Sequence, residues 1–286
     1  MCTIHLAVPP NIARALTHDL SRLYPEATFR PPMTHDEMDH FFCNRFGEPH
    51  ETAHLTLTAY PEGIRRALKP DYRNCFAPIP DSLPPMRQEL VQAGLKEESD
   101  IYKVVCVVPM MILTGKEMAE KISGWKDLAE EPFPGRMVIP PANTPAPDLF
   151  RLYMESLCGE KGRMAADTVQ ASLLPQDINK SIDEGNHLAG MVFPAFGRTS
   201  RNGTTQAIWP QEGAVAIPLV ALLRADAPPM ATQILDVIFS NLIQTRLAEE
   251  GLFLAIRDDV PLIDEMVENH NHLAWCGWEN HIGSHA

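Results

Sequence analysis

The sequence lacks the short motifs that most often mark hydrolytic or nucleotide chemistry. It contains no Gly-x-Ser-x-Gly elbow, no phosphate-binding loop and no glycine-rich dinucleotide fingerprint. No apolar run approaches the ~18 residues of a membrane-spanning helix, so the chain is not expected to cross a membrane. Positive charge is also scarce, with 24 Lys and Arg against 37 Asp and Glu and a formal net charge of −13. Because nucleic acids are bound by concentrated positive charge, we expect no nucleic-acid partner.

Cysteine is sparse and scattered. The six cysteines form no Cys-x-x-Cys pair, and Cys106 lies inside an apolar run where it is expected to be a small buried hydrophobe. This pattern favours a reducing compartment over a disulfide framework. The segment Met1–Val8 reads directly as a strand, without a basic start or a cleavage site. It predicts a cytoplasmic location for the chain as given, or a periplasmic one if a leader has been removed.

What the sequence does contain is a large apolar content and alternating strand and helix patterns. At 286 residues and 45% hydrophobic, it can bury a core large enough for two lobes. Two long apolar runs, Ile101–Leu113 and Ala214–Leu223, are predicted to be strands that leave one lobe and return to it. We therefore predict an α/β fold with lobe 1 formed by residues 1–107 and 222–286, and lobe 2 by residues 108–221.

Local patterns place several helices. Asn11 is predicted to cap the first one, and the capping-box residues Thr34 and Glu37 to start the second. One continuous helix is predicted over Ala231–Ala248, because its apolar residues recur at helical spacing.

The most informative segment is residues 123–148. It begins with a Trp-anchored turn at Trp125 and passes through Pro-x-x-Gly into a short apolar strand ending at Pro140-Pro141. The loop Ala142-Asn143-Thr144 and a helix start at Pro145 follow. A strand that ends in a loop at a helix N-terminus is expected to present free backbone N–H groups to an anionic or polar ligand.

Three motifs in this order, the Trp125 segment, Trp209-Pro210-x-x-Gly213-Ala214 and the helix block after Pro229, resemble the type II solute-binding proteins of ABC importers. The ferric-iron and organic-ion branch is the most similar, and the resemblance covers roughly residues 99–255. It implies a two-lobed periplasmic-binding-protein type II fold with two hinge-crossing strands, which closes on a ligand rather than catalysing a reaction. It also implies a small-molecule or ion ligand and an ABC transporter permease as partner, without a resident metal or cofactor.

Ligand contacts in such a fold are expected from loops at the carboxyl ends of strands. The residues predicted on this basis are Pro9, Asn11, Thr58, Tyr60, Asn143, Thr144, Phe193, Phe196, Arg198 and Trp209. The resemblance implies a pair of adjacent tyrosines for Fe(III) in lobe 2, but the matching region, Val192–Arg198, has none. A small organic anion is therefore the expected ligand. Two alternatives stay open: the aromatic residues can be lobe core, and the basic loop 197–203 can be a surface turn.

A competing interpretation comes from His50-Glu51-Thr52-Ala53-His54, which matches the His-Glu-x-x-His motif of zinc hydrolases. That chemistry needs a helix through both histidines, whereas the alternating residues after His54 predict a strand. The residues near the C-terminus that could also form an adventitious metal site are His270, His272, His281, His285 and Cys276. A solvated, frayed tail is the expected alternative. A third hypothesis is a ligand-sensing module that acts through a protein partner.

Overall fold

The chain divides into two compact units. The computed structural model describes residues 2–199, 203–270 and 272–283. Unit 1 comprises Met1–Val107, Pro218–Pro261 and Trp278–Ala286, and unit 2 comprises Val108–Ile217 and Leu262–Gly277. The expected lobe 1 includes all of residues 222–286 and excludes residues 218–221, whereas residues 262–277 group with unit 2 and residues 218–221 with unit 1. The chain therefore changes unit at four points rather than two.

Two long strands are shared by the units: each has one part in unit 1 and the other part in unit 2. They are β5 (Tyr102–Gly115) and β10 (Ala214–Arg224), which coincide with the two long apolar runs of the sequence. Both are almost fully buried along their length, which explains why they read as continuous apolar runs rather than as alternating ones.

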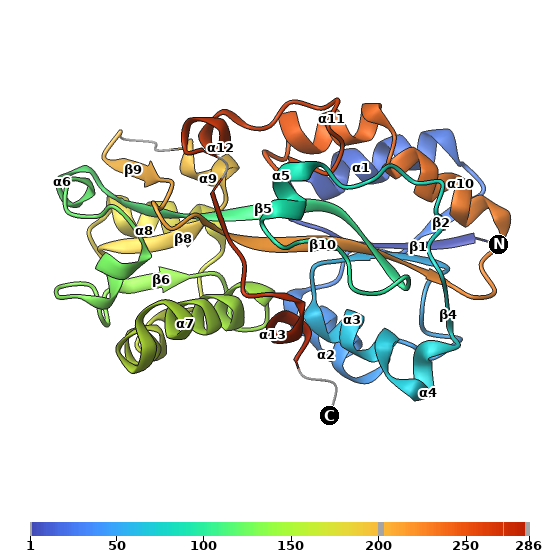
Figure 1. The fold of residues 1–286 in the computed structure, drawn as a ribbon, viewed down its shortest axis with the longest axis horizontal. Helices are drawn as coiled ribbons and strands as arrows, with labels where there is room; N and C mark the ends of the chain where they lie inside the picture. Colours follow the sequence, from blue (N-terminus) through green and yellow to red (C-terminus); the bar gives the residue numbers. More distant parts are fainter. Residues whose placement is uncertain (1, 200–202, 271, 284–286) are drawn as a thin grey trace. The chain divides into compact units, whose positions relative to one another are not determined.

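Unit 1 is a mixed sheet covered by helices. Its other elements are β1 (Cys2–Ala7), α1 (Pro10–Leu23), β2 (Ala27–Phe29), α2 (His35–Asn44), β3 (Leu55–Thr58), α3 (Pro61–Leu68), α4 (Pro70–Arg73), β4 (Phe76–Ala77), α5 (Gln88–Gln92), α10 (Pro229–Ile238), α11 (Asn241–Glu249), β11 (Leu254–Ala255) and α13 (Trp278–Ile282). The strand order is β2-β1-β3-β10, with β1 parallel to both neighbours and β3 antiparallel to β10. Within this unit, α1, α10 and α11 lie over one face of the strands and α2 and α3 over the other (Figure 1).

Unit 2 is built in a similar way. Its other elements are α6 (Lys116–Ala119), the 3₁₀ helix η1 (Trp125–Ala129), β6 (Met137–Ile139), α7 (Pro145–Asp167), β7 (Gln170–Ala171), α8 (Pro175–Asp183), β8 (Ala189–Val192), α9 (Pro194–Gly197), β9 (Thr205–Ile208), α12 (Asp264–Glu268) and β12 (Leu273–Ala274). The order is β5-β8-β6-β7, with β6 parallel to β7 and β8, and β5 antiparallel to β8 and β9. Among the described residues, no helix combines the length and apolar character that crossing a bilayer demands.

Two local expectations require correction. The N-cap of α1 is Pro9, so Asn11 lies inside the helix and does not cap it. The predicted helix over Ala231–Ala248 is two helices, because Ser240 caps α11 with its hydroxyl and ends the run of α10. By contrast, the capping box at Thr34 is present, with both of its reciprocal hydrogen bonds.

The C-terminal end also differs from the expected frayed tail. Helix α13 packs in unit 1, with Trp278 and His281 at 1% and 3% exposure. The Trp278 indole N–H donates to the carbonyl of Lys96, and Arg65 donates to the carbonyl of Ile282 at the helix end. The expected metal site at this end includes His285, which lies outside the described residues. Burial and the nearby Arg65 lower the pKa of His281 to about 3, so its ring is neutral.

Candidate ligand-binding edges

In unit 1, the predicted ligand contacts meet at one edge of the sheet. Strands β1 and β3 run parallel, and their last residues, Ala7 and Thr58, are register partners. The loop after β1, which carries Pro9 and Asn11, therefore leaves the sheet beside the loop after β3, which carries Tyr60. Carboxyl ends of adjacent parallel strands are where ligands bind in open α/β sheets.

The side chains at this edge are largely held by the protein itself. The Thr58 hydroxyl is buried and accepts a hydrogen bond from the Tyr60 N–H at 3.0 Å. The Tyr60 ring stacks on Phe42 with 5.1 Å between centroids, and its hydroxyl lies 3.2 Å from Nδ1 of His35. Asn11 donates from Nδ2 to the carbonyl of Gly251 at 3.3 Å. The sequence analysis missed His35, although the capping box at Thr34 places it as the first residue of α2.

In unit 2, the remaining predicted contacts also gather at one edge. Strands β6 and β8 are parallel neighbours, so the loop at Asn143 and Thr144 leaves the sheet beside the segment from Phe193 to Arg198. On β5, Ile112 pairs with β8 on one side and with β9 on the other. Trp209, which directly follows β9, therefore lies at the same end of the strands as the segment after β8.

The helix start at Pro145 offers less to an anion than the sequence analysis expected. The Thr144 N–H and hydroxyl both donate to the carbonyl of Pro141, at 3.0 and 2.6 Å. Pro145 and Pro147 have no N–H, so at most the N–H of Ala146 is free in the first turn of α7. The expectation of several free N–H groups at this loop is therefore wrong.

The same limitation applies at the other strand-to-helix junctions. Helices α1, α3 and α9 also begin with a proline, at Pro10, Pro61 and Pro194. Proline at this position is favourable for the helix because its φ is pre-set, but it removes one of the few unbonded N–H groups. These helix starts therefore present few backbone N–H groups at either edge.

The aromatic residues of unit 2 are mainly packing residues. Phe193 is buried and forms an edge-to-face pair with Phe196, with 4.8 Å between centroids. Phe196 in turn packs against the apolar core that includes Val192 and Ile178. Trp209 is 7% exposed and donates its indole N–H to the carbonyl of His272 at 3.0 Å. Of the two interpretations left open for these aromatics, their burial favours the core.

Arg198 is the charged residue at this edge. It follows α9, its side chain is 47% exposed, and its Nε and Nη2 donate to the two carboxylate oxygens of Glu265, both at 2.6 Å. Glu265 lies on α12, beside α9 in Figure 1. The Glu265 carboxylate raises the pKa of Arg198 through these hydrogen bonds. Burial by itself raises the pKa of Glu265, but the hydrogen bonds from Arg198 hold it below its usual value. Residues 200–202 of the predicted basic loop lie outside the described residues.

The motifs that carried the resemblance prove to be structural. The carboxylate of Glu212 accepts the backbone N–H of Trp125 at 2.9 Å, and the Trp125 indole donates to the carbonyl of Gly213 at 2.8 Å. A Cβ on residue 124 would meet the same carboxylate at 1.8 Å, so any larger residue there would displace Glu212 from this position. The two motif segments thus bind each other and fix the turn before β6.

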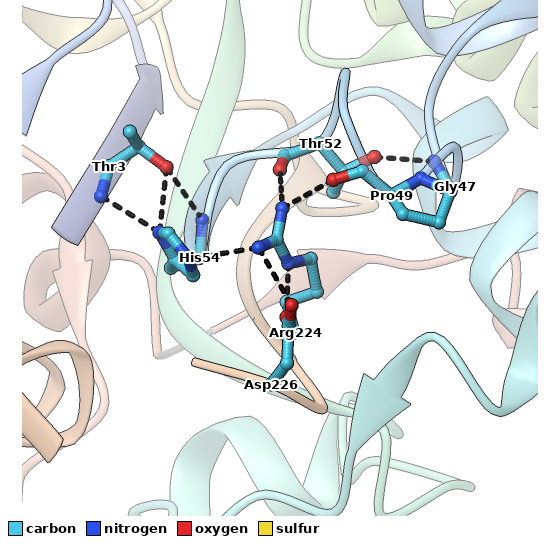
Figure 2. Close-up of polar contacts among 7 residues, drawn as sticks. All are labelled: Thr3, Gly47, Pro49, Thr52, His54, Arg224 and Asp226. Atoms are coloured by element: carbon cyan, nitrogen blue, oxygen red, sulfur yellow. Dashed lines mark hydrogen bonds and ion pairs between the residues drawn. The ribbon is translucent and has the colours of Figure 1, made fainter. Parts of the chain in front are cut away.

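The His-Glu-x-x-His segment is not helical. Residues 48–54 form turns, β3 starts at Leu55, and His50 is exposed. Figure 2 shows that His54 lies between Thr3 and Arg224, with its Nδ1 2.8 Å from the Thr3 hydroxyl and its Nε2 accepting from Arg224 at 2.8 Å. Arg224 also donates to the carbonyls of Pro49 and Thr52. Both ring nitrogens of His54 are therefore occupied within the protein.

These contacts define the state of His54. The Thr3 backbone N–H donates to Nδ1 at 3.0 Å and the Arg224 cation donates to Nε2, so both ring nitrogens face hydrogen-bond donors and the contacts favour the uncharged ring. Burial and the Arg224 charge lower the pKa of His54. Among residues 2–199, 203–270 and 272–283, no group of three or more His, Cys, Asp or Glu side chains is arranged to hold a metal ion. The geometry gives no support to a zinc hydrolase.

Comparison with known proteins now defines the class. Residues 70–281 match the family model described as bacterial extracellular solute-binding protein, and the chain belongs to that family. No curated protein sequence matches the chain closely enough to count as a relative. The fold is that of the type II periplasmic binding proteins.

Three solved structures illustrate the likeness in fold. The apo ferric ion-binding protein A of Pasteurella haemolytica has a TM-score of 0.75 at 12% identity, over 99% of this chain and 94% of that one. A Trichodesmium protein (IdiA, FutA) in complex with iron and citrate has a TM-score of 0.66 at 14% identity, over 94% and 90%. A protein described as a two-component system protein that mediates signal transduction has 0.74 at 17%, over 99% and 96%. This chain is a solute-binding protein of the same architecture.

Proposed function

We propose that the protein is the solute receptor of an ABC importer and that its solute is a small organic anion. The observation that carries the choice of ligand is the unit 2 edge, where Arg198 supplies a partly exposed guanidinium and no tyrosine is present. A guanidinium binds carboxylates in a bidentate manner, whereas Fe(III) prefers anionic oxygen ligands such as phenolate. Tyr153, the one tyrosine between residues 108 and 217, lies in α7 beside Trp125.

Several features support this proposal. The paired strand ends of each unit place residues from distant parts of the sequence at a common edge. The proline-started helices offer few backbone donors, which disfavours a tetrahedral oxyanion bound by N–H groups alone. As a solute receptor, the protein acts by binding, and a ligand that prefers the closed state shifts the equilibrium of the two lobes towards closure. A transporter permease is the proposed partner.

A thermal-shift screen tests the ligand class. Citrate, succinate, phosphate, sulfate, ferric chloride and simple amines are compared as additives with the full chain. A ligand present at 100 times its dissociation constant adds about 2.7 kcal/mol to the free energy of unfolding. We expect a di- or tricarboxylate to give the largest shift. Stoichiometric stabilisation by ferric ion alone would contradict the proposal.

The similarity to a protein of signal transduction motivates a second candidate, a sensor that acts through another polypeptide. The two candidates differ in their partner. Affinity purification from the native source should recover a permease if the protein serves import. Recovery of a regulatory protein, with none of the permease, would favour the sensor.

A further inference from the structure

The ion pair between Arg198 and Glu265 has the geometry that a ligand carboxylate would use. Both carboxylate oxygens lie at 2.6 Å from the guanidinium, on its Nε and Nη2. This is the bidentate arrangement by which arginine recognises carboxylates in general. The partner is 67 residues away in the sequence, so the contact is made by the fold and not by local chain proximity.

The Glu265 side chain is more enclosed by the protein than the Arg198 side chain. It is 20% exposed, against 47% for the arginine. The segment that carries it is fixed to unit 2 at a second point, where β12 pairs with β10 through Leu273 and Ala274. A third contact is the hydrogen bond from Trp209 to the carbonyl of His272. The carboxylate is therefore presented to the edge by an anchored segment.

From these contacts we propose that Glu265 is an internal competitor, a carboxylate of the protein that occupies Arg198 until a ligand carboxylate takes its place. The inference rests on the proposed function, because it assumes that Arg198 contacts the solute. The exposed half of the Arg198 side chain gives a ligand access while Glu265 is still bound. Exchange then replaces the bidentate pair of Arg198 and Glu265 by a bidentate pair of Arg198 and the ligand. Releasing Glu265 therefore costs the protein little free energy.

Two consequences follow for specificity. A ligand must offer more than a single carboxylate, because one carboxylate only replaces what Glu265 already provides. The additional binding energy must come from a second anionic or polar group at the same edge, which favours di- and tricarboxylates over monocarboxylates. Glu265 thereby raises the threshold for binding and selects against simple acids such as acetate.

Calorimetric titration of the full chain with citrate, succinate and acetate tests this role. Glu265→Gln keeps the shape of the side chain and removes the competing charge. We expect it to bind citrate or succinate roughly tenfold more tightly or better, which corresponds to the loss of one charge-assisted pair. Acetate, too weak to displace Glu265 in the unaltered protein, should become measurable.

Matched variants separate this effect from general electrostatics and folding. Glu268→Gln makes the same charge change on the same helix, at an exposed residue, and should leave the affinities close to those of the unaltered protein. Glu265→Asp keeps the charge but shortens the reach, and it should give an intermediate affinity. Arg198→Gln should abolish binding whether residue 265 is Glu or Gln. Melting curves confirm that each variant is folded.

The outcomes distinguish the two proposals. If the unaltered protein binds citrate or succinate and Glu265→Gln binds no more tightly, the competitor role is wrong while the organic-anion receptor stands. If Glu265→Gln and Glu268→Gln tighten binding equally, the effect is general charge and the competitor role is again wrong. If neither the unaltered protein nor any Glu265 variant binds a carboxylate, both proposals fail. Binding seen only with Glu265→Gln would support the competitor role most strongly.

Discussion

The two units share their construction but differ in what holds their interiors. In both, parallel strands lead into helices that begin with proline. In unit 1, however, a titratable side chain lies in the interior: His5 on β1 and its register partner Thr56 on β3 are both buried. The His5 ring stacks on Phe42 and packs edge-on against Phe41. The core of unit 1 therefore contains a titratable group.

Unit 2 is held together by apolar packing, by hydrogen bonds of buried neutral side chains such as that from Thr205 to Asn179, and by close backbone contacts. Its core cluster includes Leu113, Val138 and Ile178, and the Glu212 carboxylate and the Gly213 carbonyl fix the Trp125 turn. Its histidine with a lowered pKa, His187, is partly exposed at the unit's periphery. A common layout therefore does not give the two units a common sensitivity. The stability of unit 1 should respond to acid, and the stability of unit 2 should respond to changes in side-chain volume.

The largest expected effect is on unit 2. Gly213 has φ of +103°, and a Cβ there would lie 2.6 Å from the backbone of Leu273. Gly213→Ala combines backbone strain with a backbone clash, so it should lower the free energy of unfolding by about 3 kcal/mol or more. Gly277→Ala, also at positive φ but with nothing within 4 Å, is the matched control and should cost about 1 kcal/mol. Denaturant unfolding followed by tryptophan fluorescence measures both, and equal losses would show that the close contact is unimportant.

Acid should act on unit 1. Burial lowers the pKa of His5 to about 4, with a further contribution from Arg30. In the unfolded chain His5 binds a proton near pH 6.5, whereas in the folded chain it does so only near pH 4. The folding stability that depends on neutral His5 is therefore fully present above pH 6.5 and is lost as the pH falls towards 4. The loss from His5 alone should reach about 3 kcal/mol. His5→Leu should remove that part of the pH dependence, measured by denaturant unfolding between pH 7.5 and 4.5; an unchanged slope would contradict the assignment.

A smaller effect is expected at His54, also in unit 1. His54→Ala leaves Arg224 without one acceptor and Thr3 without its ring partner, which should cost about 1–3 kcal/mol. Because the ring is occupied by these contacts, the metal content of the protein should not change, as elemental analysis will show. His50→Ala, at an exposed turn residue, is the control. Stoichiometric zinc that is lost in both variants would revive the hydrolase.

The smallest expected effect on stability concerns two threonine N-caps, one in each unit. Thr34 caps α2 in unit 1 with a complete capping box, whereas the Thr144 side chain forms no cap bond to α7 in unit 2. Thr34→Ala should therefore cost about 1 kcal/mol and Thr144→Ala a few tenths. Thermal unfolding of the two variants side by side gives the difference, and the reverse order would be inconsistent with the caps described.

These residues also show what sequence can and cannot predict. The capping box at Thr34 and the apolar strand over Ile101–Leu113 could be predicted because their signals are local. The break at Ser240 was missed, because the apolar spacing continues through it and only the cap geometry separates the two helices. The family could be predicted from three ordered motifs, but two of them bind each other and mark the fold rather than the ligand.

The candidate site was predicted less completely. The loops at the strand ends could be named, since the alternation of strands and helices fixes where such loops lie. The prolines at their helix starts are visible in the sequence, and they leave few N–H groups there. Glu265 had no sequence signal at all, because its contact with Arg198 depends on where residues 262–277 pack. Long-range contacts of this kind come only from the fold.

The most direct test of the central claim is a calorimetric titration of the unaltered chain and of Arg198→Gln with citrate and succinate. The account predicts saturable binding of one of these carboxylates, with one molecule per chain, that the arginine substitution abolishes while the protein remains folded. Binding of the same strength in Arg198→Gln would contradict the placement of the anion at Arg198. Tight binding of ferric ion alone, with no carboxylate bound by either protein, would contradict the proposed ligand class itself.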